Sequence, residues 1–218
     1  MPYLSSANLA AITATPEVIA GCYANTRSAF VSDLGPAFAG QCEDHLRLAF
    51  CSVVAFDLKP YGASLALSLR DLLAEDALDC DNYVRLAWHL FNLMRPLSPT
   101  NVAAVGWNGG AIGNHAQLQA RTPGSPDIYL DPTIGLVVFG CGLDSLCRQF
   151  PFQPQHLKSF FGFNSRPSIS AFDPVVRQAI QGGQYKASDL LYFVPDLERF
   201  TRLGGSSTWA TPQSWLIA

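Results

Sequence analysis

Charged residues are scarce in this chain of 218 amino acids. Lys and Arg together number 14 and Asp and Glu number 17, so 14% of the residues are charged, whereas an average soluble domain has about 25%. The formal net charge is −3, and such a chain lacks the basic surface with which proteins coat nucleic acids. We therefore expect no nucleic acid among its partners.

Long apolar runs are absent as well. The most apolar uninterrupted stretches, such as residues 48–56 and 134–139, are much shorter than the ~18 residues that span a bilayer. The N-terminal segment has no basic region followed by a long apolar one, so it does not look like an uncleaved secretory signal. The sequence thus predicts no membrane partner, although the mature form of an exported protein would have the same appearance.

Cysteine is too sparse for a disulfide scaffold, with six residues in the whole chain. Cys22 and Cys51 lie in apolar helical patterns, where a thiol packs as a small hydrophobic group. This usage favours a reducing compartment, and we expect the cytoplasm. The even number leaves a disulfide open, for which Cys141 and Cys147 are the best pair. Their spacing is too long for a zinc knuckle.

Apolar residues, in contrast, are abundant. They make up 49% of the chain and aromatic residues 11%, which is enough for one large core, so we expect a single domain over residues 1–218. The first half has helical periodicity. Thr15 and Pro16 provide an N-cap and a first-turn proline for a helix that Gly35 ends. Further helices are expected at residues 41–56, 63–75 and 80–95.

Strand patterns follow the helices. The expected strands are residues 101–105, 115–120, 128–131 and 134–139. Helices followed by an antiparallel sheet define an α+β fold, in which N-terminal helices pack on the sheet. Eight of the 14 phenylalanines lie from residue 150 onward. We therefore expect a core at about 41–140 and an aromatic-rich C-terminal elaboration at about 150–218, with one helix at 173–182.

Cys80 is the strongest candidate for a nucleophile. It stands at the start of an expected helix, directly after Asp79 as N-cap. Backbone N–H groups and the positive end of the helix dipole favour a thiolate at this position. A thiolate needs an imidazole to accept and return the proton, and the imidazole needs a third group to fix its tautomer. His115 and Asp131 have these chemistries.

A simple register argument brings His115 and Asp131 together. If the hairpin turn is centred on Pro123, the two residues lie directly opposite each other on neighbouring strands. Directly opposed residues have Cβ atoms about 5 Å apart. The sequence therefore predicts a carboxylate–imidazole hydrogen bond, which a one-residue slip of the register would abolish.

Three segments of the sequence resemble the transglutaminase-like superfamily of papain-like thiol enzymes. They read LDCDNYVRL, GNHAQL and YLDPTIG, and the match covers residues 78–138. The resemblance implies a papain-like α+β core in which Cys80 is the nucleophile, His115 the general base and Asp131 its orienter. It implies no cofactor.

The resemblance also implies a reaction. Cys80 attacks an amide or other acyl carbonyl, and water or an amine releases the thioester intermediate. Hydrolysis of a peptide, amide or acyl substrate is favoured, because stand-alone members of the superfamily are similar to proteases and amidases more often than to true transglutaminases. Transfer to an amine acceptor is the alternative among enzymes. A non-catalytic binding module on the same fold is the alternative outside them.

Other interpretations compete for these residues. Cys42 opens a similar segment, CEDHLRL, but lies 73 residues before His115, whereas Cys80 lies 35 before it. Gln41 falls upstream, where the superfamily places an oxyanion-hole side chain, and the backbone N–H of Cys80 is the other candidate donor. A metal site from Cys80, His115 and Cys141 has no recognisable ligand spacing, so no metal is expected. The other histidines are assigned to packing or to the surface: His45, His89 and His156.

Overall fold

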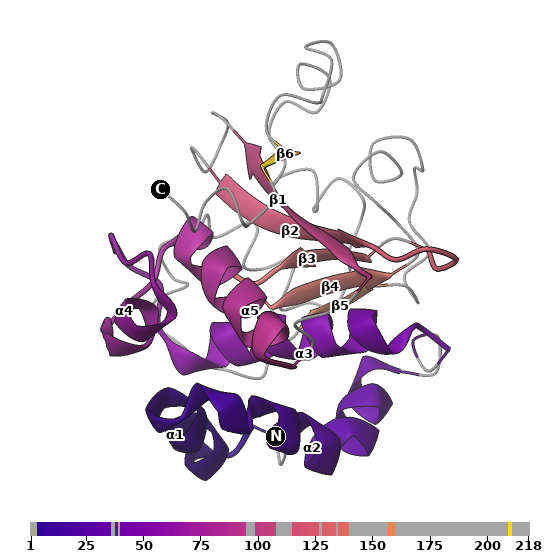
Figure 1. Ribbon diagram of the computed structural model, residues 1–218, viewed down its shortest axis with the longest axis horizontal. Coiled ribbons are helices and arrows are strands. Elements are labelled where there is room, and N and C mark those ends of the chain that lie inside the picture. The colour runs from indigo at the N-terminus through magenta and orange to yellow at the C-terminus, as the bar shows by residue number, and fades with distance from the viewer. Residues whose placement is uncertain are drawn as a thin grey trace.

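The fold consists of helices on one side of an antiparallel sheet (Figure 1). The computed structural model describes residues 4–35, 38, 40–94, 99–107, 115–126, 128–133, 135–139, 157–159 and 209–210. In these residues the helices come first and most of the strands follow, which is the α+β order that the sequence predicts.

The helical layer is formed by the first 94 residues. Its elements are α1 (Ser6–Ala14), the 3₁₀ turn η2 (Pro16–Val18), α2 (Ile19–Leu34), α3 (Glu43–Leu58), α4 (Leu69–Ala74) and α5 (Cys80–Met94). Gly35 ends α2 with a φ of 103°, a conformation that favours glycine. α3 is the central helix, because almost every residue from Asp44 to Asp57 is buried.

Three of the four expected helices are confirmed, and one is largely wrong. The segment 63–75 forms only the short helix α4, because residues 61–67 run outside any helix and Ser68 caps the new start by accepting a hydrogen bond from the Asp71 N–H at 3.2 Å. The sequence did not predict α1, whose N-cap Ser5 accepts from the Asn8 N–H.

The sheet has the strand order β5-β4-β3-β2-β1-β6, with every neighbouring pair antiparallel. Its strands are β1 (Asn101–Trp107), β2 (His115–Arg121), β3 (Ile128–Asp131), β4 (Leu136–Phe139), β5 (Leu157–Ser159) and β6 (Trp209–Ala210). The first four confirm the predicted strands. Both outer strands come from the part of the chain after residue 150, and the helix expected at 173–182 lies outside the described residues.

One face of the sheet packs on the helices. Leu118, Ala120 and Leu130 belong to the same apolar core as the buried residues of α3 and α5. At one end of this face, the Thr100 hydroxyl donates to Asp44 Oδ2 at 3.1 Å, and Thr122 Oγ1 lies 3.0 Å from His45 Nε2. These two contacts bind the start of α3 to the ends of β1 and β2.

The register between β2 and β3 differs from the predicted one. Leu118 pairs with Leu130, so Asp131 falls opposite Gln117, and the expected direct pairing of His115 with Asp131 is wrong. The reason is the turn. Its centre is Gly124, with a φ of 78°, and the Ser125 N–H donates to Thr122 O at 3.0 Å.

None of the described helices combines the length and the apolar composition that spanning a bilayer requires.

Candidate active site

Cys80 is the first residue of α5, as the sequence predicts. The Asp79 side chain caps the helix, since its Oδ1 accepts from the Asn82 N–H at 3.2 Å. The Asp79 carbonyl accepts the first intrahelical bond, from the Tyr83 N–H at 3.0 Å. Cys80 is partly buried. Its sulfur therefore belongs to the first turn of a 15-residue helix, where the dipole favours a negative charge.

Asp79 is itself electrostatically unusual. Burial, followed by a hydrogen bond to Asp81, raises its pKa to about 6, against an ordinary 3.8, although the Asn82 N–H acts in the opposite direction. The start of α5 thus holds a carboxyl group that changes charge near pH 6.

The chain before Cys80 is held by a second segment. Tyr61 forms a parallel bridge with Leu78. The Leu78 N–H donates to Pro60 O at 3.0 Å and the Gly62 N–H donates to Leu78 O at 2.9 Å. The contact is so close that a Cβ on Gly62 would lie 2.7 Å from the Cβ of Ala77. This pairing fixes the backbone two residues before the candidate nucleophile.

Asp131 ends β3 and is completely buried. Its Oδ2 accepts from Gln117 Nε2 at 2.7 Å, and its Oδ1 accepts from the Thr133 N–H at 3.1 Å. The second bond closes an Asx turn, and this short-range structure accounts for the sequence DPT in the motif. Two donors on different segments hold the carboxyl group in one orientation, as an orienting group requires.

Gln117 and Gln119 lie on the same side of β2, and each is 1% exposed. Leu118 between them belongs to the apolar core that includes the helices. The face that carries Gln117, Gln119 and Asp131 is therefore polar yet buried. Such groups need hydrogen-bond partners.

His115 is the first residue of β2. Its backbone pairs with Trp107, and it lies two residues before Gln117. The structure thus puts the backbone of His115 diagonal to Asp131, two residues along the strand from the position that the sequence predicts. Diagonal neighbours are about 7 Å apart, still within reach of long side chains.

Tyr61 interacts electrostatically with both Cys80 and Asp131. Burial raises the pKa of its phenol, and the nearby acidic groups Cys80, Asp79, Asp131 and Asp81 raise it further. Cys80 and Asp131 therefore both lie within electrostatic range of one side chain, although 51 positions separate them in the sequence. Sequence reasoning missed Tyr61, because its place depends on a bridge between distant segments.

Cys42 lies at the opposite end of the sheet. It precedes α3, and its neighbours Asp44 and His45 contact Thr100 and Thr122, beside the end of β2. β2 has seven residues and is thus about 20 Å long, which separates this end from His115 and Asp131. Gln41 shares the location of Cys42, so neither can serve a site built around Asp131.

The other histidine and cysteine interpretations agree with the structure where it describes them. His45 is buried in the contact with Thr122, and burial lowers the pKa of His89. Cys51 is buried, and its Sγ lies 3.3 Å from the Met94 sulfur. The suggested Cys141–Cys147 pair and His156 lie outside the described residues.

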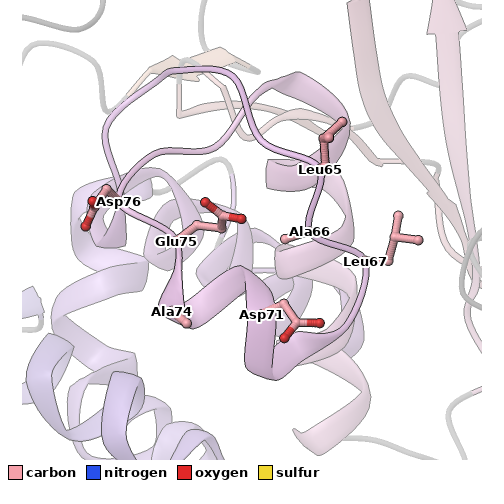
Figure 2. A pocket seen from close by; sticks show the side chains of 7 residues that line it. All are labelled: Leu65, Ala66, Leu67, Asp71, Ala74, Glu75 and Asp76. Carbon is pink, nitrogen blue, oxygen red and sulfur yellow. The ribbon is translucent and has the colours of Figure 1, made fainter.

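A surface hollow of about 570 Å³ opens beside the segment that leads to Cys80. Figure 2 shows it between residues 65–67 and the end of α4, with the carboxylates of Asp71, Glu75 and Asp76 around it. Leu65 is 95% exposed there. Asn82 Nδ2 donates to Ala66 O at 2.7 Å, so the first turn of α5 holds residues 65–67, which line one side of the hollow.

Within the described part of the chain, no three His, Cys, Asp or Glu side chains gather as a metal site. Comparison of the sequence with protein-family models, and of the chain with curated proteins and solved structures, gives no match.

Proposed function

We propose that this protein is a thiol enzyme with a papain-like core of the transglutaminase-like kind. Cys80 is the nucleophile, His115 the general base and Asp131 the group that orients His115. The substrate is a peptide, amide or other acyl compound, and the reaction needs no cofactor. The proposal keeps the reducing, cytoplasmic compartment expected from the cysteine usage, since the thiol must stay reduced.

The chemistry proceeds in two steps. The Cys80 sulfur forms a bond to the carbonyl carbon while His115 takes the thiol proton, and the carbonyl π electrons move to the oxygen. When the carbonyl re-forms, the bond to the leaving group breaks and His115 returns the proton to it. Water then attacks the thioester, and the acid and the thiol are regenerated.

One observation carries the proposal. A thiol at the N-terminus of α5 and a buried, doubly hydrogen-bonded carboxyl group at the end of β3 share the neighbourhood of Tyr61. His115 stands two residues before Gln117, the donor to that carboxyl group. The backbone of His115 is therefore close in sequence and in register to the pair of Gln117 and Asp131.

The first test is the reactivity of the cysteines. We expect iodoacetamide near neutral pH to alkylate Cys80 at least about tenfold faster than the other five, because a helix N-terminus and a base favour its thiolate. Cys42 is the matched control, since it also stands at the start of a helix with an acidic first turn. Equal labelling of Cys42 and Cys80, measured by mass spectrometry, would favour the binding module.

Turnover is the second test. Release of p-nitrophenol from p-nitrophenyl acetate should disappear in Cys80→Ala and persist in Cys42→Ala. Asp131→Asn should lower the rate by orders of magnitude, as an amide can hold the wrong imidazole tautomer. An active Cys80→Ala protein contradicts the proposal. An added primary amine separates hydrolysis from transfer, since a transferase forms mainly the amide and a hydrolase mainly the acid.

A further inference from the structure

The further inference concerns Tyr61 and rests on the proposed function. A thiol that attacks a carbonyl creates an oxyanion, and a donor fixed close to the sulfur stabilises it. Gln41, the side chain that the sequence suggests for this role, lies beside Cys42 at the other end of the sheet. The position of the side-chain donor is therefore open.

The backbone of Tyr61 is held next to the nucleophile. The bridge to Leu78 and its two flanking hydrogen bonds lock residues 60–62 to the segment that enters α5. Lys59, at the end of α3, strengthens this arrangement. Its carbonyl accepts from the Tyr83 hydroxyl at 2.6 Å, and its ammonium donates to the carbonyls of Leu73 and Glu75 at 2.7 and 2.6 Å. Tyr61 thus lies two residues after Lys59, which is fixed to both α4 and α5.

Burial and, after it, the acidic groups around Tyr61 raise the pKa of its phenol. The phenol is half-buried and is affected by Cys80, Asp79 and Asp81 at the start of α5 and by Asp131 on β3. Each of these groups is an acid, and all of them raise the pKa of the phenol. A phenol in such surroundings remains a hydrogen-bond donor throughout the neutral range, and donors are what a developing oxyanion requires.

We propose that the phenol hydroxyl of Tyr61 donates a hydrogen bond to the oxyanion that forms when Cys80 attacks the substrate carbonyl. The backbone N–H of Cys80 is the companion donor. When the carbonyl re-forms, its electrons return from the oxyanion and the leaving group departs. The Tyr61 proton stays on the phenol throughout. Tyr61 is then a catalytic residue, because it touches the reacting oxygen.

Two reactions of the same thiol test the proposal. Acylation by p-nitrophenyl acetate passes through a tetrahedral oxyanion, whereas alkylation by iodoacetamide displaces iodide at a saturated carbon and forms none. In Tyr61→Phe the acylation rate should fall about 100-fold or more, the usual effect of removing one oxyanion donor. The alkylation rate of Cys80 should change by less than about threefold.

The controls separate this role from a structural one. Tyr23→Phe removes another buried phenol, one that packs against Phe50 with ring centroids 5.2 Å apart, and it should leave both rates unchanged. Tyr61→Leu removes the ring as well and should show the same selective loss, which keeps the test available if the Phe variant folds poorly.

Either of two other results for Tyr61→Phe would overturn the assignment of Tyr61 as an oxyanion donor. An equal fall of both rates would make Tyr61 a residue that positions or activates the thiol. Unchanged acylation would remove it from the site. Failure of the proposed function looks different, because p-nitrophenol release by the wild-type protein would then not depend on Cys80 at all.

Discussion

Asp79 caps the N-terminus of α5 and carries a charge that its surroundings disfavour. Burial raises its pKa to about 6, so the folded protein binds a proton that the unfolded chain releases near pH 3.8. This preference for the neutral form favours folding below about pH 4 and is lost as the pH rises through about 6. Above that pH the buried carboxylate lowers the free energy of unfolding.

Asp79→Asn should therefore stabilise the protein at neutral pH. Asparagine is as good an N-cap as aspartate, so the hydrogen bond to the Asn82 N–H is kept while the charge is removed. We expect the difference in melting temperature between variant and wild type to be small at pH 4, to grow up to about pH 6 and then to level off. A difference independent of pH would contradict the role of this carboxyl group.

At the level of single residues, the sequence predicts the helix start at Cys80 and the end of β3 at Asp131. Both depend on local signals, an N-cap and an Asx turn, which short segments determine by themselves. The pairing of His115 was predicted wrongly, because Gly124 rather than Pro123 is the centre of the turn. Tyr61 could not be predicted, since no local pattern encodes its bridge to Leu78.

The contact between residues 60–62 and the segment before α5 is the element that positions the site. Gly62→Ala should disturb it, because the new Cβ would lie 2.7 Å from the Ala77 Cβ. Overpacking of this kind costs about 1–3 kcal/mol, and a displaced Tyr61 should also slow acylation. Thermal unfolding and p-nitrophenol release measure the two effects.

Gly21→Ala is the matched control, since a Cβ there meets nothing within 4 Å. It lies inside α2, so the change should stabilise the protein by up to about 1 kcal/mol and leave the activity intact. A Gly62→Ala protein with wild-type stability and rate would show that the close contact does not position the site.

Long elements were predicted best. The apolar periodicity of α2, α3 and α5 continues over 15 or 16 residues, and such a pattern has few alternatives. The segment 63–75 has a similar pattern of leucines, but residues 63–67 form no helix and leave Leu65 exposed. Backbone bonds to the Leu78 segment and the Ser68 cap outweigh its helical propensity.

For the molecule as a whole, the part of the chain after residue 150 completes the sheet. β5 pairs with β4 and β6 pairs with β1, so these two strands cover both edges. A chain ending before Phe150 should expose the edges of β1 and β4, which promotes aggregation through strand pairing. We expect it to be insoluble, as measured by the soluble fraction after expression and by light scattering.

A chain ending after Ser159 is the comparison, because it keeps β5 and loses only β6. It should be more soluble than the shorter chain and less soluble than the full one. A soluble, fully active chain ending before Phe150 would refute the structural role of this segment. The sequence predicts the α+β order of the molecule, but the strands of two or three residues at its edges are too short for any pattern to identify.

The pairing of β1 with β6 also determines when folding can finish during synthesis. β1 is complete at residue 107, and β6 follows about 100 residues later, which a ribosome adds in about 5 to 20 s. For those seconds β2 can protect one side of β1, while the other side still waits for β6, its neighbour among the described strands. Neighbouring nascent chains on one messenger RNA carry the same unpaired edge of β1 at the same time. Dense ribosome loading is therefore the condition under which β1 strands of different chains are most prone to pair with each other.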